Sequence, residues 1–162
     1  MNTLALPVDL NSPDQLSATS LELAAYMSSL RDAAVRAKSN GQDIQLPDMS
    51  DLLTELLRAS GVDPENSAGL DDMRTQLDQL LNKAPVVHLT LAALPARTFK
   101  RKMTLWFRTE VHPFILLTFA ARADLGGGVV LQSGSHVYDY TFRRSILDNK
   151  KRISELTFGV RR

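Results

Sequence analysis

The sequence predicts an α+β protein, with a small helical region followed by a β-α-β-β-β-α domain. Up to residue 83, apolar residues recur every three or four positions, which is the spacing of amphipathic helices. From residue 84 the pattern changes to short alternating runs bounded by Gly and Pro, which is typical of strands, and helical spacing returns twice. We therefore expect a mobile tail at 1–15, a helical region at 16–83 and an α+β domain at 84–162.

The first predicted helix follows the tail, whose two prolines and several polar residues disfavour packing. Thr19 and Glu22 have the spacing of a capping box, in which each side chain bonds to the backbone near the other. The apolar stripe that follows predicts a helix to Lys38, ended by Asn40 and Gly41. Such a stripe can bind a partner, but packing within the chain is its commoner use.

Two shorter helices complete the helical region. Asp48 or Ser50 can cap the second helix, and Gly61 ends it. After a linker at 62–69, the third helix spans 71–83 with an inner face of Met73, Leu77, Leu80 and Leu81. Because three short helices bury little surface alone, we expect this region to need the C-terminal domain or a partner.

The C-terminal domain is predicted to hold two helices on one face of a sheet. Its elements in order are a strand at 87–91, a helix at 96–110, strands at 114–121, 129–132 and 136–140, and a helix at 142–156. The run at 114–121 is apolar throughout, which suits a central strand. The helix at 96–110 should turn Phe99, Met103 and Trp106 or Phe107 inward. Its other side is nearly all basic, with Arg97, Lys100, Arg101, Lys102 and Arg108.

The composition is that of an ordinary globular protein, with 44% hydrophobic and 23% charged residues among 162. There is no cysteine, which excludes disulfides and Cys-based zinc sites, and no stretch reaches the roughly 18 to 20 apolar residues of a membrane span. The net charge of +1 is the sum of opposite charges in the two halves of the chain. Residues 1–96 contain 6 Lys/Arg and 13 Asp/Glu, a net −7, whereas residues 97–162 contain 13 and 5, a net +8. The two halves either contact each other or face different partners.

The most specific stretch of the chain is a hairpin that leads into the last predicted helix. Gly127 and Gly128 precede an alternating strand, a Ser-Gly-Ser turn follows, and a second strand runs back. Thr141 then stands where the N-cap of the helix would lie, with Asp139 two residues before it. Because both side chains can accept hydrogen bonds from exposed N–H groups, we interpret them as a cap rather than as a polar active site.

The order of these residues resembles the signature of the delta subunit of F-type ATP synthases, called OSCP in mitochondria. The matching residues are Gly127-Gly128-Val129-Val130, Gly134, Val137-x-Asp139-x-Thr141-x-Arg143 and Leu147. Thr141 takes the place of the serine that the family carries. The resemblance covers roughly 85–156, and the N-terminal half is shorter than the helical bundle of the family and divergent from it.

The resemblance implies a stator subunit of the peripheral stalk, with no chemistry, cofactor or metal of its own. Its structural motif would be Gly127, Gly128, Asp139, Thr141 and Arg143. Its partners would be the b subunit of the stalk and the alpha subunits of the catalytic head, and nucleic acid is not expected. The protein would then lie peripherally at the cytoplasmic face of the cell inner membrane, or at the organellar equivalent. Candidate partner-binding residues are Arg97, Lys100, Arg101, Lys102 and Arg144. A V-type E subunit is a related alternative, but the Asp-x-Thr-x-Arg sequence favours delta.

No catalytic constellation stands out. His88, His112 and His136 lack the i, i+4 spacing of a helical zinc pair, and the glycine triplet lacks the Lys-Ser/Thr of a phosphate-binding loop. The basic helices indicate one alternative function, that of a basic adaptor or RNA-binding domain. We expect Phe99 and Trp106 on the buried side, which disfavours base stacking, and no RNP-type aromatic motif is present.

Overall fold

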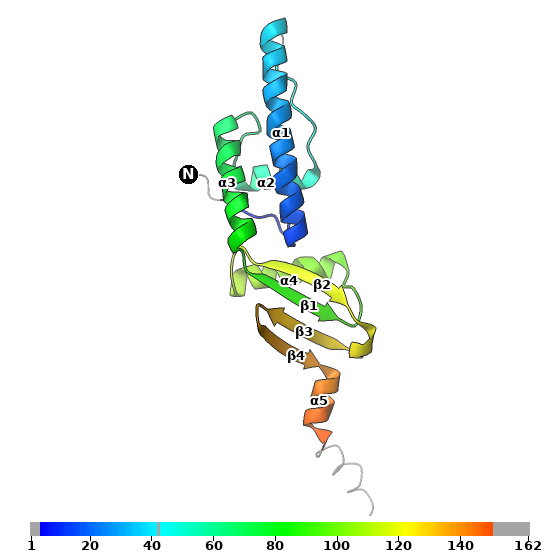
Figure 1. The fold of residues 1–162 in the computed structure, drawn as a ribbon. Helices are drawn as coiled ribbons and strands as arrows, with labels where there is room; N and C mark the ends of the chain where they lie inside the picture. The colour runs from blue at the N-terminus through cyan, green and yellow to red at the C-terminus, as the bar shows by residue number, and fades with distance from the viewer. Residues whose placement is uncertain (1–3, 42, 151–162) are drawn as a thin grey trace, which may run out of the picture. The chain divides into compact units, whose positions relative to one another are not determined.

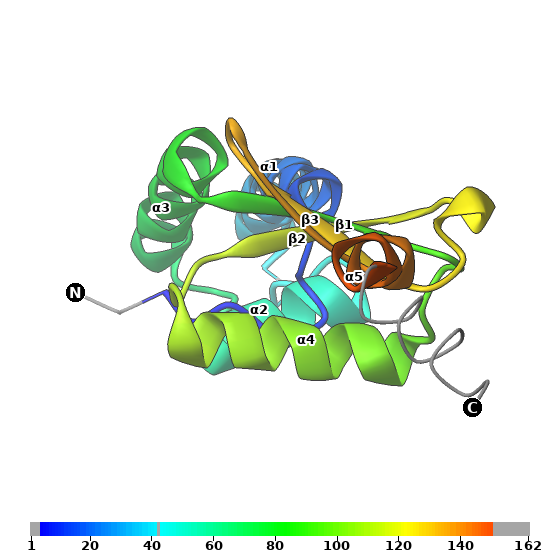
Figure 2. The ribbon, with the colours of Figure 1, turned by 90° about the horizontal axis from the view of Figure 1, so that it is seen from below.

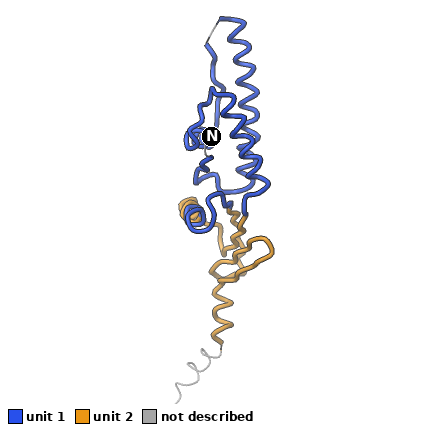
Figure 3. The backbone as a smooth tube through the Cα atoms, turned by 90° about the vertical axis from the view of Figure 1, so that its left-hand side faces the viewer, with its two compact units in different colours: residues 1–85, 104–116 blue, residues 86–103, 117–162 orange. Residues whose placement is uncertain are grey.

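The computed structural model describes residues 4–41 and 43–150 (Figure 1). It is an α+β protein with five α-helices and a mixed four-stranded sheet in the described part, which confirms the predicted class. The chain divides into two compact units (Figure 3). Unit 1 comprises residues 1–85 and 104–116, and unit 2 comprises residues 86–103 and 117–162.

Helix α1, Pro13–Asn40, begins six residues before the predicted capping box. Ser12 is its N-cap, because the Ser12 hydroxyl accepts a hydrogen bond from Gln15 N–H while the Gln15 side chain accepts from Ser12 N–H. The predicted start at Thr19 is wrong, since Thr19 is buried inside the helix and its hydroxyl donates to the Gln15 carbonyl at 2.8 Å. The predicted end is correct, with Gly41 as a left-handed C-cap.

The segment before α1 is anchored in unit 1, although we expected a mobile tail at 1–15. Leu4 and Leu10 are buried. The Arg108 guanidinium donates to three backbone carbonyls of this segment, at 2.9 Å for Leu6, 2.8 Å for Pro7 and 2.6 Å for Leu10. Apolar side chains and a half-buried cation thus hold residues 4–10 in place.

Helices α2, Asp51–Ser60, and α3, Ser67–Lys83, complete the helical part of unit 1. Ser50 caps α2 and Gly61 ends it, as predicted. Asn66 caps α3, so the last three residues of the predicted linker at 62–69 are helical. The predicted inner face of α3 is confirmed for Met73 and Leu77, which are buried, and it is wrong for Leu81, which is exposed. Leu70 is buried as well, so the buried face begins one turn earlier than predicted. The core of unit 1 is built from the side chains of Leu10, Leu16, Leu23, Leu53, Leu56, Leu70, Met73 and Leu77.

The sheet has the order β2-β1-β3-β4. Its strands are β1, Val86–Leu91; β2, Leu116–Ala121; β3, Gly128–Ser133; and β4, His136–Thr141. β1 pairs with β3 and β3 with β4 in antiparallel registers, so β1 and β2 form the parallel pair of this mixed sheet. The prediction that 114–121 is a central strand is wrong, because β2 is an edge strand.

Helix α4, Arg97–Glu110, connects β1 to β2 (Figure 2). Its buried residues are Thr104 and Phe107. The predicted inward face is therefore wrong for Phe99 and Trp106, whose side chains are 43% and 54% exposed. The apolar residues of α4 are more numerous than its narrow buried stripe requires, so periodicity alone did not select the correct face.

Helix α5, Phe142–Asp148, follows β4 directly. None of its side chains is buried. Residues 151–156 of the predicted helix lie outside the described residues. Coverage of one sheet face by two helices therefore remains a prediction.

Candidate functional site at the hairpin and the start of helix α5

Two glycines allow the backbone of β3 to approach the start of α5 closely. Gly127 has a φ of 133°, and a Cβ added there would lie 2.6 Å from Cδ2 of Phe142. Gly128 has a φ of 86°, and its added Cβ would collide with the Tyr140 carbonyl oxygen and lie 2.7 Å from the Thr141 Cα. Only glycine satisfies both the positive φ and the lack of space. The Phe142 N–H also donates to the Gly127 carbonyl at 3.3 Å, which ties the helix start to the strand.

Thr141 joins β4 to α5, because it is both the last residue of the strand and the N-cap of the helix. Its hydroxyl accepts from Arg144 N–H at 3.3 Å. Asp139 Oδ1 accepts in turn from the Thr141 hydroxyl at 2.6 Å and from Thr141 N–H at 2.9 Å. The predicted cap is confirmed, and the Asp139 carboxylate holds the capping residue in place through these two hydrogen bonds.

The environment of Asp139 favours its charged form. The hydrogen bond from the Thr141 hydroxyl, and then the one from the Thr141 N–H, holds the pKa of the Asp139 carboxyl below its usual range. The nearby charges of Arg144 and Arg122 add to this lowering of the pKa. Arg122 also forms an exposed ion pair with Asp124 at 3.0 Å. These two residues lie between β2 and β3, and the sequence pattern did not indicate that they lie near the cap.

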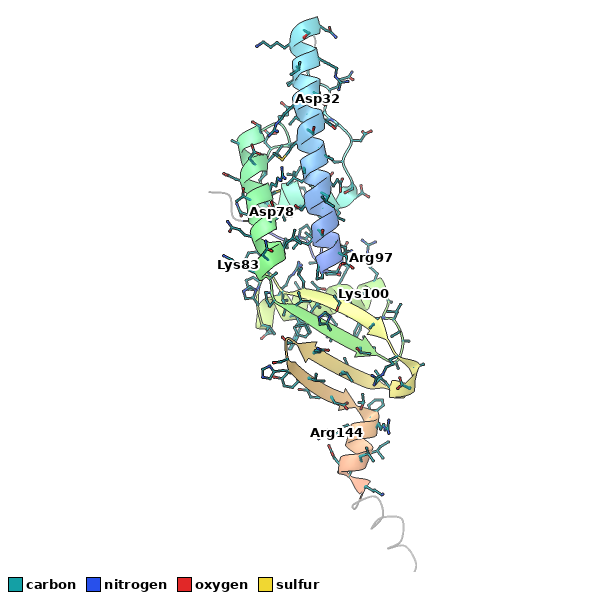
Figure 4. The ribbon with its side chains drawn as sticks, in the orientation of Figure 1. Asp32, Asp78, Lys83, Arg97, Lys100 and Arg144 are labelled. Carbon is teal, nitrogen blue, oxygen red and sulfur yellow. The ribbon has the colours of Figure 1, made fainter. Side chains whose placement is uncertain are left out.

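The predicted basic residues do not form one cluster. Figure 4 shows Arg97 and Lys100 on α4, whereas Arg144 lies on α5. The Lys100 ammonium lies 5.6 Å from the centre of the Phe119 ring of β2, and Arg144 Nε donates to Asp148 at 3.2 Å. Arg143, the last residue of the predicted motif, is exposed on α5. Arg101 and Lys102, on α4, are exposed as well.

The separation of charge follows the two units. Unit 1 contains 7 Lys/Arg and 14 Asp/Glu, a net −7, and unit 2 contains 12 and 4, a net +8. Asp32 on α1 and Asp78 on α3 belong to the acidic unit (Figure 4). The two units therefore differ in the sign of their net charge.

The histidines and the acidic side chains of the described residues lie apart from one another. Within 4–41 and 43–150, no three His, Cys, Asp or Glu side chains come together as a metal site requires. His88 Nδ1 contacts the Thr118 hydroxyl at 2.5 Å, while His112 Nδ1 accepts from Phe114 N–H. A cavity of about 600 Å³ opens on unit 1 between the N-terminal segment and α3. Its lining includes Leu4, Val62, Asp72, Met73 and Gln76, a mixture with no cluster of catalytic groups.

No helix in the described part of the chain is long and apolar enough to cross a membrane. No protein-family model matches the chain, and no curated protein matches it. The site must therefore be interpreted from its own residues and from the resemblance of its motif.

Proposed function

We propose that this protein is a delta-type stator subunit of an F-type ATP synthase. It would link the catalytic head to the b-subunit stalk, so that rotor torque drives synthesis instead of turning the head. The protein would perform no chemistry, and it would bind no cofactor. It would associate with the cytoplasmic face of the inner membrane, or with its organellar equivalent, through the complex.

One observation carries the proposal. Four of the residues that resemble the delta signature, Gly127, Gly128, Asp139 and Thr141, act together at a single junction, where the glycine pair and the Asp139–Thr141 cap attach the hairpin to α5. A stator has to transmit load without yielding. Close backbone packing and a hydrogen-bonded cap fix the direction in which α5 leaves the sheet. A junction that transmits mechanical force needs such a fixed direction.

The N-terminal unit would contact the catalytic head. Its acidic surface and its anchored helices are compatible with docking to a folded partner, since complementary charge directs such encounters. This part of the proposal depends on the position of unit 1 in the chain, because its sequence departs from the family.

A basic RNA-binding module is the second candidate, and one observation favours it. Phe99 is 43% exposed on the same helix as the exposed Lys102, so an aromatic ring and a basic side chain both lie on the surface of α4, as a nucleic-acid site requires. The expected burial of Phe99 and Trp106 therefore no longer argues against this function.

The experiment that tests the stator function is affinity purification of the tagged full chain from gently solubilised membranes of its source. We expect the b, alpha and beta subunits to co-purify in fixed ratio and to remain after a wash in moderate salt. Recovery of RNA without these subunits, with binding that falls steeply as salt rises through counterion release, would contradict the stator function and support the second candidate.

A further inference from the structure

On one face of the sheet in unit 2, the side chains become more exposed from β1 through β3 to β4. The strand registers place Leu89, Leu131 and Tyr138 in one row on this face, with Val129 and Tyr140 in the next. Leu89 is 2% exposed and Leu131 is half-buried, whereas Tyr138 and Tyr140 are 47% and 63% exposed. The face is therefore a packed core at β1 and an open apolar surface at the β3–β4 hairpin.

Phe142 extends this open surface from β4 into α5. Its ring occupies the space above Gly127, where any Cβ would be only 2.6 Å from the ring, and its side chain is 64% exposed. We define the aromatic strip as Tyr138, Tyr140 and Phe142, together with Val129 and Leu131 on the neighbouring strand. At about 3.4 Å per residue, the stretch from Tyr138 to Phe142 spans roughly 14 Å, which matches two to three turns of a helix.

The residue types of the strip are those that dominate binding energy in protein interfaces. Tyrosine supplies a large apolar area together with a hydroxyl that can stay hydrated at the rim, and its side chain has few rotamers to immobilise. The half-buried aliphatic residues Val129 and Leu131 lie beside the rings on β3, between the tyrosines of β4 and the buried Leu89 of β1. An aliphatic surface of this kind suits a packed side-chain interface better than it suits stacked bases.

The charge of unit 2 decides which occupant fits. Without residues 151–162, the unit contains 8 Lys/Arg and 3 Asp/Glu, a net +5, and Arg143 and Arg144 follow Phe142 directly in the sequence. The chain's own residues 151–162 contain four Lys/Arg and one Glu, so this segment would meet like charge on the strip. A partner with an acidic rim would instead gain from the same field.

We propose that the aromatic strip docks an amphipathic helix whose polar face is acidic. Resting on the function proposed above, we assign this helix to the b-subunit stalk. The inference moves the expected stalk contact from the basic face of α4 to the hairpin and α5.

The test uses the full chain and two designed 20-residue peptides that share one leucine face. One peptide carries glutamate on its polar face and the other carries lysine. Binding is measured by calorimetry at 150 mM salt for wild type, for Tyr138→Ser/Tyr140→Ser and for Val137→Ser. Val137 is the matched control, because it is 60% exposed on the same strand but points to the opposite face of the sheet.

We expect the acidic peptide to bind wild type and Val137→Ser alike, within about twofold, and to lose at least about tenfold in affinity for the double variant. The lysine peptide should not bind. Failure of the acidic peptide to bind, equal binding of both peptides, or equal losses in both variants would overturn the proposal. Two results would overturn the assignment of the occupant. One is concentration-dependent dimerisation that the double variant abolishes, and the other is displacement of the peptide by a single-stranded RNA.

A second measurement does not depend on the variants. The chain has only three tyrosines, so ring signals of tyrosine-labelled protein are readily assigned by NMR. The acidic peptide should shift the signals of Tyr138 and Tyr140 and leave those of Tyr26, which is buried in unit 1, unchanged. Unmoved signals from Tyr138 and Tyr140 would overturn the proposal even if the double variant did not fold.

The stalk assignment is tested separately with the C-terminal peptide of the b subunit from the same source. If the designed acidic helix binds the strip and the b peptide does not bind at all, the docking surface stands and the stator function fails. If the b peptide binds with equal affinity to wild type and to the double variant, the stator function stands and the strip is not its site.

Discussion

Gly126, Gly127 and Gly128 all have a positive φ, but they differ in the space around the missing Cβ. A Cβ at Gly126 would meet nothing within 4 Å, whereas one at Gly128 would collide with backbone atoms of β4. Gly126→Ala isolates the conformational cost of a positive φ, which is about 1 kcal/mol. Gly128→Ala adds a backbone displacement to that cost, so we expect a loss of about 3 kcal/mol or more in the free energy of unfolding.

Urea denaturation of the two alanine variants measures both losses under the same conditions. Equal losses for Gly126→Ala and Gly128→Ala would show that the close approach of β3 to Thr141 has no energetic importance.

Thr141 supplies the hydroxyl that caps α5, and its side chain is 5% exposed. Thr141→Ala should lower the free energy of unfolding by about 0.5 to 2 kcal/mol, because Arg144 N–H and Asp139 both lose a partner. Thr141→Ser keeps the hydroxyl and should lose much less. Denaturation of the three proteins side by side checks this, and a serine variant as unstable as the alanine variant would point to the lost methyl group instead of the cap.

Asp139 makes the stability of unit 2 depend on pH. Because its pKa is lower in the folded state than in the unfolded state, its contribution is fully present above the unfolded pKa of about 4. The contribution is then lost as the pH falls through the lower pKa of the folded state. Asp139→Asn should therefore be less stable than wild type at pH 7, and the difference should shrink at pH 3. A difference that is constant between these two pH values would contradict the role of the carboxylate charge.

At the scale of elements, local signals predicted caps and turns well. Ser50, Gly41, Gly61 and Thr141 were identified correctly because each bonds within a few residues of its own position. The start of α1 was missed although its signal was present, since Ser12-Pro13-x-Gln15 is a capping box with Pro at the first helical position. Pro13 was instead assigned to the tail, with Pro7 and the polar residues around them.

Properties that depend on distant segments could not be predicted in the same way. The edge position of β2 is set by strand order, which an apolar run does not encode. The alternation of β4 does place Tyr138 and Tyr140 on one face, but only the sheet shows that this face is left open. The role of Arg108 was also hidden, because its hydrogen-bond partners lie about 100 residues earlier in the chain.

Arg108 connects the N-terminal segment to α4 within unit 1. Burial lowers the pKa of its guanidinium to about 10, so the side chain is still charged at neutral pH. Arg108→Met would leave the carbonyls of Leu6, Pro7 and Leu10 without this donor. We expect a loss of about 2 kcal/mol or more in the free energy of unfolding and faster proteolysis before residue 12.

Lys102→Met is the matched control for this change, because it removes an exposed positive charge from the same helix. Mass spectrometry of a timed protease digest compares the two variants with wild type. Equal cleavage of the N-terminal segment in all three proteins would show that Arg108 does not anchor it.

At the scale of the whole molecule, the two units carry opposite net charge. Unit 1 is acidic and unit 2 is basic, and the aromatic strip belongs to the basic unit. A protein that joins two partners needs two distinct surfaces, and opposite charge helps each surface to reject the wrong partner. This division is compatible with the link between a head and a stalk that we propose.

The most direct measurement of the stator function is the ATPase activity retained on membranes after a low-salt wash, with and without this chain. Membranes depleted of the chain should release the catalytic head, so their bound ATPase should fall and that of the wash should rise. Adding back the purified full chain should restore the bound activity, together with ATP-driven proton pumping. Bound activity that is the same before and after depletion would contradict the proposal that this protein holds the head to the stalk.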